Sequence, residues 1–192
     1  MANYDRVFHM DTKYKQLANS QQIDEKISQI ATKILNDFPN ETPLFVGLLR
    51  GAAPFAAKLM SEIVRQSPSY HPELDYMMVS TYGDGQHAGE PHIVTDLAPS
   101  TIVTSRSVIV IDDVLDKGIT ADFVKNHLLN RGATAASLAV LCDKKTERLR
   151  DVTADYCGFE FEDNWLVGMG MDDAGAANEG YRWLDEIWEI KQ

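Results

Sequence analysis

The sequence has few cysteines: Cys142 and Cys157 are the only two among 192 residues. Both lie inside apolar segments, and no second pair of metal-ligating residues accompanies them. We therefore expect two buried free thiols rather than a disulfide or a zinc site.

Positive charge is also scarce. The chain has 18 Lys and Arg residues against 29 Asp and Glu residues, for a formal net charge of −11. A broad surface for nucleic acid or an anionic membrane needs a basic stripe, and the sequence contains none. We expect neither kind of partner, so any polyanionic substrate must be bound by a few local groups.

Long apolar runs are absent as well. No segment approaches the length of a membrane span, and the first residues lack the basic and apolar regions of a signal peptide. A cytoplasmic location is the default expectation. With 44% hydrophobic and 24% charged residues, residues 1–192 are predicted to form a single domain with a sizeable core.

The most informative segment is 108–120. Residues 108–111 are β-branched and apolar, which predicts a buried parallel strand, and Asp112 and Asp113 follow directly. A short glycine-containing turn then leads into a helix predicted to begin at Thr120. In open α/β sheets such crossings lie at the carboxyl ends of the strands, where ligands bind.

The helix start and the two aspartates suit different ligand groups. Free backbone N–H groups and the positive end of the helix dipole suit a phosphate. Carboxylates would repel that phosphate, so we expect Asp112 and Asp113 to face ribose hydroxyls or a hydrated magnesium ion. The alternative is a buried strand followed by an ordinary solvated acidic turn.

Strands and helices alternate along the chain, which predicts an α/β fold with a Rossmann-like, mainly parallel twisted sheet flanked by helices. Ser20 is the predicted N-cap of the first helix. The predicted strands are 44–49, 75–82, 108–111 and 136–142, and the predicted helices are 23–38, 53–64 and 120–130.

Residues 83–91 form a glycine-rich polar segment that is too long for a tight hairpin. Its composition fits a flexible lid loop of about 82–97, and equally a disordered surface loop. Residues 93–97 are predicted to be the returning strand of that lid. His87 and His92 lie in or near this segment, but two histidines there do not make a metal site.

Segment 108–120 resembles the phosphoribosyl-pyrophosphate signature of the type I phosphoribosyltransferases. That signature is an apolar strand, two acidic residues, two apolar residues, Asp, Thr or Ser, Gly, any residue and Thr. Only Lys117 departs from it, where the family usually has a hydroxyl that touches the 5′-phosphate. Its ammonium either replaces that contact with a charge or points to solvent. A phosphatase of the haloacid type needs a different spacing, Asp-x-Asp directly after the strand.

The resemblance implies roles for several loops. Asp116 would accept and donate the proton at purine N7, and Thr81-Tyr82 would begin the lid. Leu49-Arg50-Gly51 would bind pyrophosphate, with a non-proline cis peptide at Leu49-Arg50. The ribose and its 5′-phosphate would be bound by Asp112, Asp113, Asp116, Lys117, Gly118, Ile119 and Thr120.

The resemblance is closest to the hypoxanthine-guanine branch of the family, which implies a purine site. Lys144 would donate to the purine O6, Trp165 would stack on the ring, and Leu166 would offer its backbone to the base edge. Without the resemblance, Lys144 reads as a solvated strand end and Trp165 as a core residue. Magnesium is the implied cofactor, held by Asp112, Asp113 and Asp172.

The match to the family weakens after Asp172. The family often has an arginine six residues further on that helps to hold pyrophosphate, but this chain has Asn178, and Arg182 is the candidate substitute. The chain ends, 1–20 and about 150–192, would form a small hood over a core of about 22–145.

Together these features imply a purine salvage enzyme. It would transfer the 5-phosphoribosyl group from phosphoribosyl pyrophosphate to hypoxanthine, guanine or both, giving IMP or GMP and pyrophosphate. The alternatives are a phosphoribosyltransferase for xanthine or another base, and a phosphoribosyl-pyrophosphate-sensing regulator without catalysis. The expected partners are these small-molecule substrates and further copies of the chain, as a homodimer or homotetramer.

Overall fold

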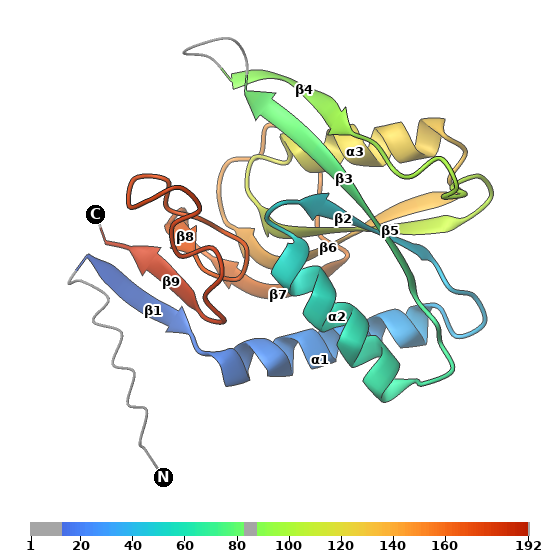
Figure 1. The fold of residues 1–192 in the computed structure, drawn as a ribbon, viewed down its shortest axis with the longest axis horizontal. Helices are drawn as coiled ribbons and strands as arrows, with labels where there is room; N and C mark the ends of the chain where they lie inside the picture. The colour runs from blue at the N-terminus through green and yellow to red at the C-terminus, as the bar shows by residue number, and fades with distance from the viewer. Residues whose placement is uncertain (1–12, 83–87, 192) are drawn as a thin grey trace.

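A computed structural model describes residues 13–82 and 88–191 of the chain. The helices and strands are arranged as an α/β fold (Figure 1). Their bounds are β1 (Tyr14–Ala18), α1 (Ser20–Asp37), β2 (Leu44–Leu49), α2 (Ala53–Gln66), β3 (Glu73–Tyr82), β4 (Ala88–Thr95), β5 (Ser107–Leu115), α3 (Ile119–Asn130), β6 (Ala135–Lys144), β7 (Tyr156–Phe161), β8 (Trp165–Val167) and β9 (Ile187–Ile190).

The larger sheet has six strands in the order β4-β3-β2-β5-β6-β7. All neighbours in it pair in parallel except β3 and β4, which pair antiparallel at one edge. Helices α1 and α2 cover one face of this sheet and α3 covers the other (Figure 1). The predicted mainly parallel sheet flanked by helices is therefore confirmed.

The core lies between this sheet and its helices. Residues 44–48 of β2 and 108–111 of β5 are all buried, because helices cover both faces of these central strands. Phe45 of β2 and Phe55 of α2 are among the largest fully buried side chains. The central strands are thus held rigidly, and so are the loops that leave them.

Two helix starts differ from the sequence-based expectation. The N-cap of α1 is Asn19, not Ser20: the Asn19 side chain accepts a hydrogen bond from the Gln22 N–H at 2.9 Å. The Gln22 side chain in turn accepts from the Asn19 N–H at 3.0 Å, which completes a capping box. Helix α3 begins at Ile119, one residue before the predicted Thr120.

The second sheet joins the two described ends of the chain. Its strand order is β1-β9-β8, and the Lys191 N–H donates to the Lys13 carbonyl at 2.8 Å. The role of this small sheet as the predicted hood stays a prediction. The assignment of residues 150–192 to the hood is wrong for β7, because β7 pairs in parallel with β6 in the larger sheet.

The hairpin of β3 and β4 carries the predicted lid. Its tip, residues 83–87, lies outside the described residues, and so does His87. The returning strand β4 ends at Thr95, so Asp96 and Leu97, which were predicted to belong to it, lie beyond it.

Both cysteines are free thiols; Cys142 is buried and Cys157 half-buried. None of the helices in the described ranges is both long and apolar enough to cross a bilayer.

Candidate functional site

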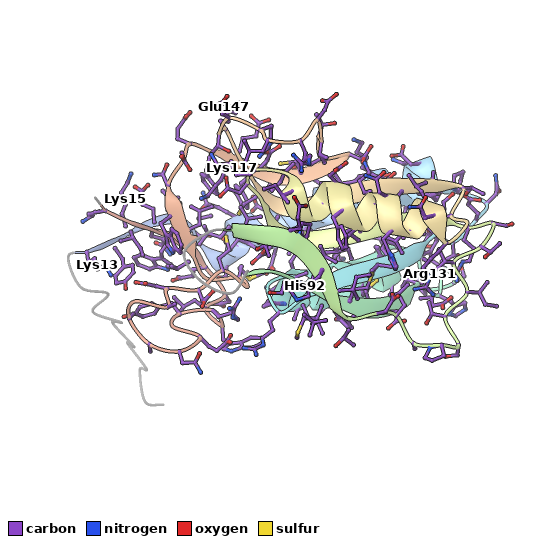
Figure 2. The ribbon with its side chains drawn as sticks, turned by 90° about the horizontal axis from the view of Figure 1, so that it is seen from above. Lys13, Lys15, His92, Lys117, Arg131 and Glu147 are labelled. Carbon is purple, nitrogen blue, oxygen red and sulfur yellow. The ribbon has the colours of Figure 1, made fainter. Side chains whose placement is uncertain are left out.

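The predicted site residues lie near the carboxyl ends of neighbouring parallel strands. The prediction that Asp112 and Asp113 follow the strand is wrong, because β5 continues to Leu115. Strand β2 ends at Leu49, β5 at Leu115 and β6 at Lys144, so the loops that follow them gather at one edge of the sheet. Figure 2 shows Lys117 at the end of α3 nearer to Lys13 and Lys15, with Arg131 at the opposite end. The candidate site therefore lies on the side of the small sheet.

A cavity of about 240 Å³ lies where β5 turns into α3. Gly118 caps the helix with a φ of 80°, and no side chain caps its first turn. The N–H groups of that turn are thus left for an anion. The lining residues are Thr81, Asp112, Val114, Leu115, Asp116, Lys117, Gly118, Ile119, Thr120 and Ala121.

Of the two predicted lid residues, only Thr81 is seen to line this cavity, and Lys117 lines it as well. Thr81 lines it, whereas Tyr82 ends β3 and its side chain lies outside what the structure describes. Lys117 also lines it, and among the described residues its ammonium has no hydrogen-bond or ion-pair partner. A contact between Lys117 and a 5′-phosphate stays a prediction.

Arg148 braces the loop after β5, and the sequence-based reasoning missed it. Its Nη1 donates to the carbonyls of Leu115, at 3.1 Å, and Asp116, while its Nη2 pairs with Asp143. The Leu149 N–H also donates to the Lys117 carbonyl at 3.0 Å. No local sequence pattern indicates this brace, because the carbonyls of Leu115 and Asp116 lie 33 and 32 residues away in the sequence.

A second cavity, of about 200 Å³, lies beside the first. Lys144 at its wall is only 9% exposed, so the reading of Lys144 as a solvated strand end is wrong. Its Nζ lies 3.5 Å from Asp116 Oδ2 and 3.8 Å from Asp163 Oδ1. The lining residues are Asp113, Val114, Asp116, Lys144, Trp165, Leu166, Met171 and Asp172.

Trp165 lines this second cavity with an exposed ring. It is 60% exposed, so the alternative that buries it in the core is wrong. Its indole N–H donates to the Asp172 carbonyl at 3.3 Å, which orients the ring. Leu166 is 5% exposed and pairs with Glu189 of β9. One face of the cavity is therefore a flat aromatic surface held by the small sheet.

Asp116 stands between the two cavities. The two cavities share only Val114 and Asp116 among their lining residues. The Thr146 hydroxyl donates to Asp116 Oδ1 at 3.1 Å, and the Lys144 ammonium approaches Oδ2. The carboxylate is thus positioned by Lys144 at the end of β6 and by Thr146 in the loop after it.

Asp112 and Asp113 form a coupled acidic pair. Burial raises the pKa of both, and the Asp113 charge raises the pKa of Asp112 further. Asp113 packs so closely on Gly51 that a Cβ there would lie 2.2 Å from Asp113 Oδ2. The acidic pair therefore lies directly against the Arg50-Gly51 loop.

The Leu49-Arg50-Gly51 loop has the predicted cis peptide bond between Leu49 and Arg50. The turn at Gly170 packs on this loop: a Cβ on Gly170, whose φ is 111°, would lie 1.8 Å from the Gly51 carbonyl oxygen. Only glycine fits there. This contact brings the segment after β8 to the edge of the loop.

The three predicted metal ligands are divided between the cavities. Asp112 lines the first cavity, whereas Asp113 and Asp172 line the second. Within residues 13–82 and 88–191, no three His, Cys, Asp or Glu side chains are grouped to hold a metal ion. The carboxylates still fit magnesium, which usually binds one or two carboxylates together with substrate phosphates and water.

Asp172 is paired with Arg182, whose Nη2 lies 2.8 Å from Asp172 Oδ1. Asn178, at the position of the family arginine, is exposed. The Arg182 side chain is 12% exposed, and its substitution for the family arginine stays a prediction.

Asp173 is a second residue that the sequence-based reasoning missed. The Tyr14 hydroxyl donates to Asp173 Oδ2 at 2.8 Å, and the Lys13 ammonium lies 3.0 Å from the same oxygen. The Tyr14 hydrogen bond is the main reason that the pKa of Asp173 is lowered. This buried carboxylate ties β1 to the segment that carries Asp172.

Comparison with known proteins gives consistent matches. A family model described as "Phosphoribosyl transferase domain" matches residues 13–174. The chain is 33% identical over 178 residues to the hypoxanthine-guanine phosphoribosyltransferase of Bacillus subtilis, covering 92% of this chain and 93% of that protein. It is 34% identical to the protein of the same name from Streptococcus agalactiae serotype V, covering 93% of each.

Solved structures agree with these sequence matches. The crystal structure of a hypoxanthine-guanine phosphoribosyltransferase from Bacillus anthracis, with a HEPES molecule in its active site, has a TM-score of 0.81. It is 31% identical to this chain, and the match covers 92% of this chain and 98% of that one.

Proposed function

The chain belongs to the phosphoribosyl transferase domain family, and on that premise we propose its reaction. It is a purine salvage transferase that moves the 5-phosphoribosyl group from phosphoribosyl pyrophosphate to hypoxanthine and guanine. The products are IMP or GMP and pyrophosphate. The names of its relatives support this choice of bases.

The observation that carries the proposal is the pair of adjoining cavities. One begins at a helix N-terminus that suits a phosphate, and the other is lined by an exposed aromatic ring and a buried lysine. Asp116 belongs to both. A ribose phosphate in the first cavity and a flat base in the second would meet beside this carboxylate.

Asp116 is the proposed proton acceptor and donor at the purine N7. The Thr146 hydroxyl and the Lys144 ammonium approach its two oxygens, so its orientation is held before substrate arrives. Lys144 also favours a 6-oxopurine. Its buried ammonium can donate a hydrogen bond to the purine O6, whereas the amino group of adenine is itself a hydrogen-bond donor.

The loop at Arg50 is the proposed pyrophosphate site. Cleavage of the anomeric bond leaves negative charge on pyrophosphate, which the Arg50 guanidinium stabilises. Asp112, Asp113 and Asp172 would hold magnesium with the substrate, and the ion would supply further charge stabilisation of the leaving group. The raised pKa values of the first two support this, because a cation beside them would relieve their mutual repulsion.

The loop between β3 and β4 is the proposed lid. Thr81 already lines the phosphate cavity, so closure of the loop from this point would cover the ribose and exclude water. We also propose a cytoplasmic location, which the free thiols support because the cytosol keeps thiols reduced.

Measuring nucleotide formation with five free bases tests the reaction. Hypoxanthine, guanine, xanthine, adenine and uracil would each be supplied with phosphoribosyl pyrophosphate and magnesium. We expect turnover with the first two. Preference for xanthine or another base would reassign the substrate, and no turnover with any base would favour a sensor without catalysis.

Association as a homodimer or homotetramer completes the proposal. Large apolar side chains such as Trp183, which is 68% exposed, support a contact between copies. Sedimentation velocity at micromolar concentration should give a mass of two or four chains, and a single-chain mass would contradict this part.

A further inference from the structure

Two arginines from distant parts of the chain converge on one carboxylate. Arg50, in the loop after β2, donates from Nη1 to Glu179 Oε1. Arg182, in the segment between β8 and β9, donates from Nε to Glu179 Oε2. Each oxygen of Glu179 is therefore bound by a different guanidinium.

Arg182 is held rigidly while Arg50 is not. The Arg182 side chain is 12% exposed, and its Nη1 and Nη2 bind the Gly170 carbonyl and Asp172. The Arg50 side chain is 61% exposed. One guanidinium is thus held by the Gly170 carbonyl and Asp172 as well as by Glu179, and the other is free to move once its carboxylate partner leaves.

The position of this pair of arginines matches the proposed pyrophosphate loop. Gly170, whose carbonyl binds Arg182, packs on Gly51, and Gly51 packs on Asp113. Asp172, the other partner of Arg182, lines the second cavity together with Asp113. Both guanidinium groups therefore lie where the leaving group would be released.

We propose that Glu179 occupies the pyrophosphate subsite of Arg50 and Arg182 in the free enzyme, until diphosphate displaces it. The inference rests on the proposed function, since it concerns the same loop at Arg50. In the free enzyme, the Glu179 carboxylate accepts the hydrogen bonds from both arginines that the leaving group would accept.

Diphosphate is suited to displace the carboxylate. It has more negative charge and more acceptor oxygens than one carboxylate, so it satisfies both guanidinium forks and the neighbouring backbone together. The Arg50 partner of Glu179 is 61% exposed, so this ion pair is largely solvated and contributes little free energy. Arg182 keeps Asp172 as an ion-pair partner when Glu179 leaves. Glu179 can therefore leave at small cost and be solvated.

Protonation is not the release mechanism. The hydrogen bond from Arg182, followed by that from Arg50, lowers the pKa of the Glu179 carboxyl. The group thus remains ionised at neutral and mildly acidic pH. Competition by a second anion is what frees the arginines.

Calorimetric titration with inorganic pyrophosphate and magnesium tests this without any turnover. Glu179→Gln removes the competing charge, so we expect pyrophosphate to bind about fivefold more tightly than to the unsubstituted chain. Arg182→Lys keeps the charge but loses the planar fork, so we expect about tenfold weaker binding. The KM for phosphoribosyl pyrophosphate should shift in the same directions, and the KM for hypoxanthine should not change.

Asp185→Asn is the matched control. It makes the same charge change on an exposed residue of the same segment, and among the described residues Asp185 has no contact with either arginine. We expect unchanged pyrophosphate binding. Unchanged or weaker binding by Glu179→Gln, or unchanged binding by Arg182→Lys, overturns the inference. If none of the five bases is used but these shifts occur, the proposed reaction fails and the anion subsite stands.

Discussion

At the scale of single residues, Asp116 carries the sharpest prediction. Its two oxygens are approached by Thr146 and Lys144, so an asparagine can keep the Thr146 hydrogen bond but cannot take up a proton. We expect Asp116→Asn to lower kcat about 100-fold while phosphoribosyl pyrophosphate still binds. Steady-state kinetics with hypoxanthine and calorimetry with the cosubstrate measure the two effects.

Asp151→Asn serves as the comparison, since Asp151 is an exposed carboxylate in the same half of the chain. It should turn over at the unsubstituted rate. An unchanged kcat for Asp116→Asn would remove this residue from the chemistry.

A second prediction at the residue scale concerns the acidic pair. Burial and the Asp113 charge raise the pKa of Asp112, so the folded chain keeps a proton that the unfolded chain has already lost. Folding stability therefore falls as pH rises from about 4, the ordinary value for aspartate, through the raised value. Asparagine removes this penalty and can still accept the Asp113 N–H, now bonded at 3.0 Å.

We expect Asp112→Asn to stabilise the magnesium-free protein by about 1 kcal/mol at neutral pH. The gain should shrink as pH falls toward 4 and vanish below it, where both states are protonated, and binding of phosphoribosyl pyrophosphate should weaken. Urea unfolding at several pH values measures the first effect. A destabilised variant at pH 7 would show that Asp112 is held by favourable contacts instead.

At the scale of elements, the loop from β5 to α3 depends on a brace from another loop. Arg148 holds the Leu115 and Asp116 carbonyls and also Asp143, three acceptors that a lysine cannot reach together. We expect Arg148→Lys to raise the KM for phosphoribosyl pyrophosphate about tenfold, because the phosphate loop loses its shape. Thermal unfolding should change by only a few degrees.

Arg150→Gln is the control for charge near the loop. Arg150 is exposed, donates to the Leu149 carbonyl at 3.0 Å and forms an ion pair with Asp122 at 3.6 Å. For Arg150→Gln, the KM for phosphoribosyl pyrophosphate should stay within about twofold of the unsubstituted value, because surface substitutions have small effects. Equal effects of the two substitutions would indicate a general electrostatic contribution rather than a brace.

The elements that the sequence predicts well are those with a local signal. Strands β2, β5 and β6 are apolar runs, and α1 has a clear helical period, so each was predicted within a few residues. Strand β1 has no such signal, because its pairing with β9 depends on residues far along the chain. The N-cap of α1 was misplaced because Ser20 and Asn19 are both good capping residues, and only the Gln22 contact distinguishes them.

The same distinction applies to the site. Asp116 directly follows β5 and Lys144 is the last residue of β6, both within recognisable motifs, so their placement at one cavity could be predicted. Arg148 and Asp173 act through contacts with backbone or side chains distant in the sequence, which no local pattern reveals.

At the scale of the whole molecule, the small sheet connects the chain ends to the site. The Tyr14 hydroxyl donates to buried Asp173, next to Asp172. Tyr14→Phe leaves that carboxylate with one donor fewer, so we expect a loss of about 1.5 kcal/mol in unfolding free energy and a lower Tm by about 3–6 °C. Pyrophosphate binding should weaken as well.

Tyr70→Phe is the matched change elsewhere. The Tyr70 hydroxyl is exposed and donates to the Glu41 carbonyl at 3.3 Å, a long and neutral hydrogen bond. The Tm of the Tyr70→Phe variant should shift by no more than about 1 °C. Differential scanning calorimetry compares the two variants, and equal shifts would contradict a special role for the bond to Asp173.

The pairing of β1 with β9 also orders events during protein synthesis. All six strands of the larger sheet, from β2 to β7, leave the ribosome before β9 does. A nascent chain can therefore complete its larger sheet before β9 is available to pair with β1. Arg182 and β9 follow the larger sheet in the sequence, so a chain truncated before Arg182 would keep every strand of that sheet and lack one arginine of the proposed pyrophosphate subsite.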